Sequence, residues 1–236
     1  MLCYLCGEAI IEEPSRDHVP PQQLWSPEIR RQFNVSRLTT LPTHLACNQA
    51  YQKDEEYAIR VLASTSYDDS LTARSVVQHG FAKATQGIGV GLHRKLIQSM
   101  DARPSGLHLP DGKVLMRVEG ARIKRVVWKV IRGLWFLEYG KSLADDTRYL
   151  CDIREPRNEA KPEFEEFWNI VRSQPSRGEY QAVFAHKYLR FEQDGELLHG
   201  WAMLLWDRLI VYCMHFDPDK PPDLNALGPR GRIAEA

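Results

Sequence analysis

Long hydrophobic runs are missing from this chain of 236 residues. Its most apolar late stretch, GWAMLLWDRLIVYCMHF, is interrupted by Asp207 and Arg208, which argues against a membrane span. The first residues are rich in thiols and lack the basic segment and apolar core of a secretory signal. With 43% hydrophobic and 26% charged residues, the composition predicts a globular protein of the cytoplasm that has no membrane partner.

Cysteine is too scarce for a disulfide framework, and a net charge is absent. The five cysteines are an odd number with uneven spacing. The 31 Lys and Arg balance the 31 Asp and Glu, but residues 74–132 hold 12 basic against 3 acidic residues, a local +9. Residues 1–60 hold 6 against 8, and residues 133–236 hold 13 against 18. A basic middle segment favours a face that binds nucleic acid, and the alternative is a set of charges scattered over solvated surface.

A phosphate-binding loop and internal repeats are also lacking. The glycine-rich stretch GIGVG at residues 87–91 follows no predicted strand and has no lysine in the Walker position. The sequence therefore gives no support to a nucleotide-binding domain of the P-loop type.

The regular pattern of the chain predicts an α+β fold. Apolar residues recur at helical spacing over residues 121–139, and Gly140 is a plausible end of that helix. Arg125, Lys129 and Arg132 fall on one face of this helix, where they are candidate contacts to a DNA backbone or simply solvated. Two strands, over residues 180–191 and 199–216, are expected around the turn EQDGEL. We predict a module at 1–66, a mixed helix and strand domain at 67–216 and a Pro- and Gly-rich tail at 217–236.

Two pairs of metal-ligating residues lie at the same spacing near the N-terminus. Cys3 and Cys6 form the first pair, and His44 and Cys47 form the second. Three sulfurs and one imidazole make a complete tetrahedral shell for Zn²⁺ with no open position, which is typical of a structural site. The alternative is two unrelated pairs. The sequence predicts a structural zinc that pins the loop between the pairs at both ends.

Asp17 and His18 are adjacent inside this pinned loop, and Asn48 directly follows the last zinc ligand. A carboxylate and an amide oxygen suit a hard cation such as Mg²⁺ or Mn²⁺. A neighbouring imidazole can take a proton from water. These three residues are the candidate catalytic site.

The segments CYLCG, SRDHVPP and LTTLPTHLACNQAYQKDEEY together resemble the HNH endonucleases with zinc knuckles, over residues 3–57. The resemblance implies a ββα-metal module in which His18 is the general base and Asp17 and Asn48 hold the catalytic divalent ion. It also implies that Lys53 can neutralise phosphate charge, unless it is merely an exposed helix residue.

The sequence departs from the family pattern at two points. His44 stands where a third cysteine is usual, and histidine binds zinc well. The family's middle Asn is expected near residues 37–39, which contain Arg37 and Thr39, and Asn34 lies upstream. The favoured hypothesis is a metal-dependent endonuclease that nicks DNA as a monomer and needs a second copy, as in a homodimer, to cut both strands. The alternatives are a zinc-stabilised module that binds nucleic acid or protein without cleavage, and an unrelated zinc protein.

Overall fold

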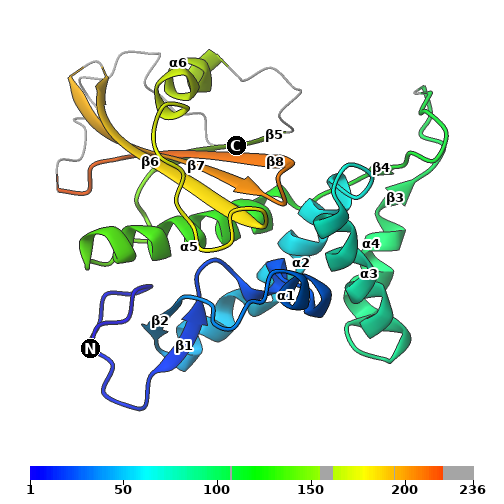
Figure 1. The fold of residues 1–236 in the computed structure, drawn as a ribbon, viewed down its shortest axis with the longest axis horizontal. Coiled ribbons are helices and arrows are strands. Elements are labelled where there is room, and N and C mark those ends of the chain that lie inside the picture. Colours follow the sequence, from blue (N-terminus) through cyan, green and yellow to red (C-terminus); the bar gives the residue numbers. More distant parts are fainter. Residues whose placement is uncertain (107, 155–161, 194, 220–236) are drawn as a thin grey trace.

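The computed structural model describes residues 1–106, 108–154, 162–193 and 195–219 (Figure 1). Its fold is mixed α+β, as the sequence predicts. The helices are η1 (Gln22–Leu24), α1 (Pro27–Gln32), α2 (Leu45–Thr65), α3 (Leu71–Thr85), α4 (Val90–Gln98), α5 (Gly120–Tyr139) and α6 (Pro162–Val171). The strands are β1 (Ser15–His18), β2 (Thr40–Thr43), β3 (Met100–Asp101), β4 (Leu115–Met116), β5 (Tyr149–Arg154), β6 (Phe184–Gln193), β7 (Glu196–Leu205) and β8 (Leu209–Phe216).

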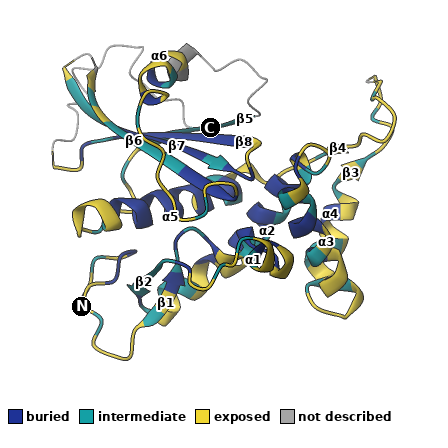
Figure 2. Ribbon diagram, viewed as in Figure 1, coloured by how far each residue is buried: buried dark blue, intermediate teal, exposed yellow. Residues whose placement is uncertain are grey.

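Helix α5 lies between two layers of the molecule. One layer is a four-stranded antiparallel sheet of order β5-β8-β7-β6, and the other contains the hairpin β1-β2 with α2 (Figure 1). The middle of α5 is buried on almost every side (Figure 2). A helix covered on opposite faces cannot present a wide polar stripe to water, so some of its basic residues must be buried.

The sheet has both faces covered. Side chains such as Trp201 and Cys213 pack toward α5 in the main core, whereas Ala202, Tyr212 and Met214 pack with Phe167 of α6. Strand β8, with the sequence LIVYCMHF, is therefore almost continuously apolar rather than alternating. The main core also contains Cys3, Tyr4 and Leu5, so the N-terminal segment shares one core with the sheet.

The predicted long helix is confirmed by α5, which ends at Gly140 in a left-handed conformation (φ 66°). The last predicted strand, residues 199–216, is instead divided into parts of β7 and β8. Trp206 and Asp207 both have positive φ, 50° and 57°, and are the central residues of a turn in which the N–H of Arg208 donates to the carbonyl of Leu205 (3.0 Å). The tail predicted from residue 217 lies outside the described residues except for its first three, where Asp217 is buried against His199.

Among the described residues, no helix has the length and apolar character that a membrane crossing requires. The domain boundaries suggested by the sequence stay a prediction.

Gly133 allows α5 to approach the chain just after His18. A β-carbon at this position would lie 2.5 Å from Val19 Cγ1 and 2.6 Å from its Cγ2. We expect Gly133→Ala to destabilise the protein by about 1–3 kcal/mol, because overpacking outweighs the roughly 1 kcal/mol that alanine gains over glycine in a helix. Urea unfolding would measure this loss.

Gly120→Ala, in the same helix, is the matched control, since nothing lies within 4 Å of its added carbon. It is expected to be neutral or stabilising. Equal stabilities for the two variants would show that Val19 moves aside at little cost and that the close approach is unimportant.

Candidate metal centre and adjoining polar cavity

Four residues from two distant segments form a metal-binding cluster. One ligand atom from each of Cys3, Cys6, His44 and Cys47 lies within 4.8 Å of the other three. Four protein ligands of the sulfur and nitrogen type are a complete tetrahedral set. The cluster can thus hold a structural metal ion, as the spacing predicts.

Local backbone structure explains how the ligands meet. The N–H of Gly7 donates to the carbonyl of Cys3 (2.9 Å), and Gly7 has the left-handed φ of 78° that closes this tight turn. On the other side, His44 is the N-cap of α2 and Cys47 lies in the first turn of that helix. A short turn and a helix start therefore each present two ligands toward one point.

Hydrogen bonds at the cluster favour binding of a cation. His44 Nε2 lies 3.3 Å from the carbonyl oxygen of Ala9, and because a carbonyl only accepts, Nε2 carries the hydrogen. Its Nδ1, 3.3 Å from Cys6 Sγ, is then the atom left to bind a metal. Burial by itself raises the pKa of Cys3, but hydrogen bonds from Thr43 and from backbone N–H groups outweigh it and lower this pKa to about 6. Cys3 is thus stabilised as a thiolate, which is the form that binds metal. Burial and the neighbouring Cys3 and Cys6 act the other way on Cys47 and raise its pKa to about 12.

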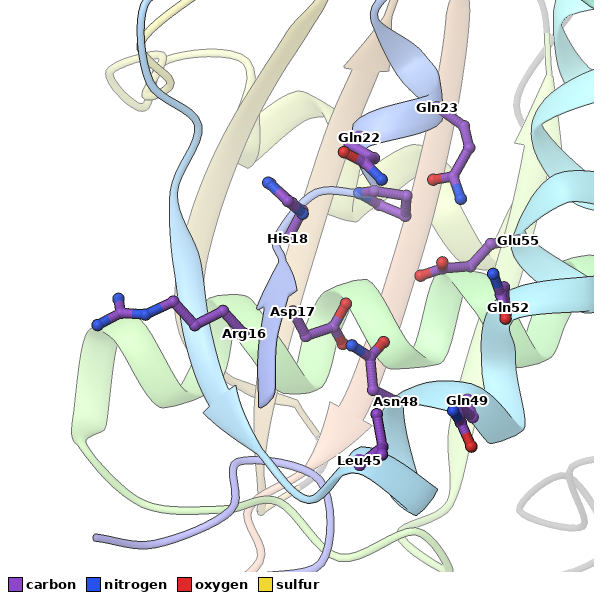
Figure 3. A pocket seen from close by; sticks show the side chains of 11 residues that line it. Arg16, Asp17, His18, Gln22, Gln23, Leu45, Asn48, Gln49, Gln52 and Glu55 are labelled. Atoms are coloured by element: carbon purple, nitrogen blue, oxygen red, sulfur yellow. The ribbon is translucent and has the colours of Figure 1, made fainter. Parts of the chain in front are cut away.

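A polar cavity of about 300 Å³ opens beside this cluster, between β1 and the first three turns of α2. The three predicted catalytic residues line it together. Asp17 and His18 come from the end of β1, and Asn48 comes from α2 (Figure 3). Asp17 and Asn48 point toward each other, and the His18 ring lies on the side of Gln22 (Figure 3). The remaining lining residues are Arg16, Pro21, Gln22, Gln23, Leu45, Gln49, Gln52 and Glu55.

His18 is half-buried, and among the described residues no hydrogen bond occupies its ring. Burial, with the positive charges of Arg30 and Lys129, holds its pKa below the usual value, and the carboxylate of Asp17 opposes this effect. The imidazole is accordingly neutral near pH 7. A neutral ring at the wall of an open cavity can accept a proton.

The carboxylate of Asp17 is buried and engaged on both oxygens. Lys129 Nζ lies 2.9 Å from Oδ1 and 2.7 Å from Oδ2, and the hydroxyl of Tyr4 donates to Oδ2 at 2.5 Å. Lys129 also contacts the buried carboxylate of Glu55. Asn48 donates from Nδ2 to Ser15 Oγ (3.1 Å), which leaves its carbonyl oxygen as the acceptor.

The donor types suit a hard divalent cation, because carboxylate and amide oxygens are its preferred ligands. A carboxylate has about four acceptor sites, and three contacts already occupy three of those of Asp17, which leaves about one for an ion. The residues therefore fit such an ion in chemistry, with an ammonium already beside the principal ligand.

Two of the three basic residues predicted to share a surface face of α5, Lys129 and Arg132, are buried, so the sequence prediction is wrong for these two. Lys129 and Arg132 are 1% and 3% exposed, so neither can contact a DNA backbone directly. Arg132 donates to the carbonyl of Leu143 (2.9 Å) and to Asp145 (2.6 Å). Arg125 is exposed, but its guanidinium pairs with Asp54 of α2. The physical reason is that α2 packs on α5 and offers carboxylates and tyrosines along the contact.

Lys53 is exposed on α2 and does not line the cavity. Asn34 is exposed too, in a left-handed conformation (φ 49°) just after α1, so it does not hold the loop that carries His18. Main-chain bonding does this instead, since the N–H of Val19 donates to the carbonyl of Thr39 (3.1 Å).

Sequence reasoning missed Glu55 and Tyr4 as parts of the site, and it assigned Lys129 to a DNA-binding face instead. Glu55 follows Asn48 by seven residues, with Gln52 between them, so a helical spacing from Asn48 could have indicated it. No local signal links Lys129 to Asp17, which lies 112 residues away in sequence.

Comparison with known proteins identifies no relative of this chain. No family model matches the chain, and neither a curated protein nor a solved structure matches it. Two features carry the functional argument. They are the four-residue cluster that can hold a metal and the cavity lined by a neutral His18 together with Asp17 and Asn48, although the His18 ring points away from the other two side chains (Figure 3).

Proposed function

We propose that this chain is a hydrolase of phosphodiester bonds, an endonuclease of the HNH type that acts on DNA. The observation that carries the proposal is the shared cavity of His18, Asp17 and Asn48 beside the metal cluster. The antiparallel pairing of β1 with β2, followed directly by α2, supports it because this is the β-β-α order that the resemblance implies.

In this proposal the cluster of Cys3, Cys6, His44 and Cys47 binds Zn²⁺, since three sulfurs and one imidazole suit that ion. The zinc joins the N-terminal turn to the start of α2 and so fixes the helix turn that carries Asn48. Its four protein ligands leave no position for a substrate, and its role is structural.

The reaction at the cavity is assigned to the chain's own side chains. His18, neutral near pH 7, accepts the proton of the attacking water. Asp17 and Asn48 supply oxygens to Mg²⁺ or Mn²⁺, which would neutralise charge on the phosphate and the leaving oxygen. Arg16 also lines the cavity, but its guanidinium points away from Asp17 and Asn48 (Figure 3), so we assign it no contact with the phosphate.

The predicted basic face also takes a different place in this proposal. Apart from Arg125, whose guanidinium pairs with Asp54, the exposed cations of the 74–132 segment lie on α3, α4 and the β3–β4 region, and they are the candidates for contact with the DNA backbone. These residues are Lys83, Arg94, Lys95, Arg103, Lys113 and Arg117. Two of them, Lys95 and Lys113, also pair with Glu119 and Asp68.

The test is nicking of supercoiled plasmid by purified protein in a buffer without divalent ions, to which Mg²⁺ or Mn²⁺ is added. Omission of the ion is preferable to a chelator, which would also attack the structural metal. We expect nicking that depends on the added ion. His18→Ala should lower its rate by roughly 10²-fold or more, because a general base contributes about 10²–10⁴.

His108→Ala, at an exposed histidine outside the cavity, is the matched control and should nick like the wild type. Equal residual nicking by wild type and His18→Ala would identify a contaminant. If the wild type and His18→Ala are both inert but bind DNA with a strong salt dependence, the chain is instead a zinc-stabilised module that binds nucleic acid without cleavage, which is the second candidate function. The engagement of Asp17 by Lys129 and Tyr4 favours that candidate.

A further inference from the structure

Lys129 is a buried cation at the floor of the candidate site. Its side chain belongs to α5, outside the β1-β2-α2 layer, yet its ammonium contacts two carboxylates that line the cavity, Asp17 and Glu55. All three side chains are nearly inaccessible to water. The proposed mechanism gives this lysine no role.

Lys129, Asp17 and Glu55 together form a second, buried cluster in which the charges do not balance. With both carboxylates ionised, two negative charges face one ammonium, and the cluster of Asp17, Glu55 and Lys129 has a net charge of −1. Buried charge is unfavourable unless it is paired, so the ammonium stabilises the carboxylates where they are. Tyr4 adds a hydrogen bond to Asp17 but no charge.

A divalent ion bound at Asp17 would compete with the ammonium of Lys129 for the same carboxylate oxygens. Adding two positive charges takes the cluster from −1 to +1, and like charges at close range in a weakly screened interior repel strongly. Without the ammonium, the two carboxylates carry −2 and the same ion would neutralise them. The side chain of Lys129 therefore opposes the binding that Asp17 and Asn48 favour.

We propose that Lys129 is a built-in cation that competes with the divalent ion for Asp17 and Glu55, and so sets the metal affinity of the site. The inference rests on the proposed function in one respect, namely that a divalent ion is used at this cavity. Lys129 acts through the two carboxylates as a positioning residue. It is buried beneath the cavity and touches no substrate.

The experiment measures binding of Mn²⁺ to the full chain with its structural metal in place and without DNA. The electron paramagnetic resonance signal of free Mn²⁺ gives the dissociation constant. We expect Lys129→Met to bind Mn²⁺ at least tenfold more tightly than the wild type. Lys129→Arg, which keeps the charge, is the matched control and should stay near the wild-type affinity.

A double variant identifies the ligands. Lys129→Met combined with Glu55→Gln returns the cluster to −1, and its Mn²⁺ affinity should fall back toward that of the wild type. If Lys129→Met binds Mn²⁺ no more tightly than the wild type, the inference is wrong.

Folding of Lys129→Met gives a second readout, because two unpaired buried carboxylates destabilise the chain. We expect Mn²⁺ to raise the melting temperature of this variant well beyond its effect on the wild type. A variant that stays unfolded at high Mn²⁺ overturns the inference, since the ion then fails to replace the ammonium. These measurements use no nuclease assay, so a chain that never nicks DNA but shows the affinity change disproves the proposed function alone.

Discussion

Cys47→Ser is expected to abolish the metal centre and with it the cooperative folding of the β1-β2-α2 layer. Structural zinc contributes apparent binding free energies of about 10–16 kcal/mol in small zinc domains. That is comparable with the entire free energy of unfolding of a typical domain, about 5–15 kcal/mol. Because Cys3, Tyr4 and Leu5 belong to the same core as the sheet, the loss should spread to α5.

Metal content and thermal unfolding test this expectation. The wild type should release one Zn²⁺ per chain when its thiols are modified, and Cys47→Ser should release none and melt at a much lower temperature without a sharp transition. Cys151→Ser on β5 is the matched control, because Cys151 is a half-buried thiol outside the cluster. It should keep the metal.

His44→Cys tests whether the cluster needs only its ligand types. A fourth thiolate also completes a tetrahedral zinc site, so this variant should retain the metal, whereas His44→Ala should not. Two results together would refute the structural metal: a wild-type protein that contains no metal, and a Cys47→Ser variant that is as stable as the wild type. The proximity of the four residues would then have another cause.

The grouping of Cys3, Cys6, His44 and Cys47 could be predicted from sequence because the chemistry of these residues is specific and their spacing is local within each pair. The same holds for α5, where the periodicity of Val126, Val130 and Leu134 reports one buried face. Its second buried face could not be predicted. Lys129 and Arg132 resemble solvated residues until their acidic partners are known, and the partner Glu55 lies 74 residues away. Pairing across long sequence separations leaves no periodic signal.

The same limit applies to the histidines of the sheet, because no sequence pattern separates them from exposed histidines. His215 is 1% exposed on β8, beneath Trp128 and Trp135. Its Nδ1–H donates to the carbonyl of Phe216 (2.8 Å), and its Nε2 accepts from the indole N–H of Trp201 (3.3 Å). A proton on Nε2 would face the N–H of Trp201, donor against donor. The ring is thus built to be neutral.

Acid is therefore expected to destabilise the fold through His215. Burial lowers its pKa from 6.5 to about 4, with the neighbouring His199 acting in the same direction and the Phe216 carbonyl and Asp217 opposing. As the pH falls below 6.5 the unfolded chain takes up the proton first, so the free energy of unfolding decreases until the pH approaches 4. A difference of this size corresponds to roughly 3 kcal/mol, fully available above pH 6.5.

Urea unfolding between pH 7 and pH 4 measures the effect, and a variant isolates it from other titrating groups. His215→Gln should lose about 3 kcal/mol less than the wild type over this range, although it begins less stable at pH 7. His108→Gln, at an exposed site, should follow the wild type. Parallel curves for wild type and His215→Gln would mean that the buried imidazole is not the group responsible. In that case His186, whose pKa is lowered to about 4 chiefly by burial, is the next to replace.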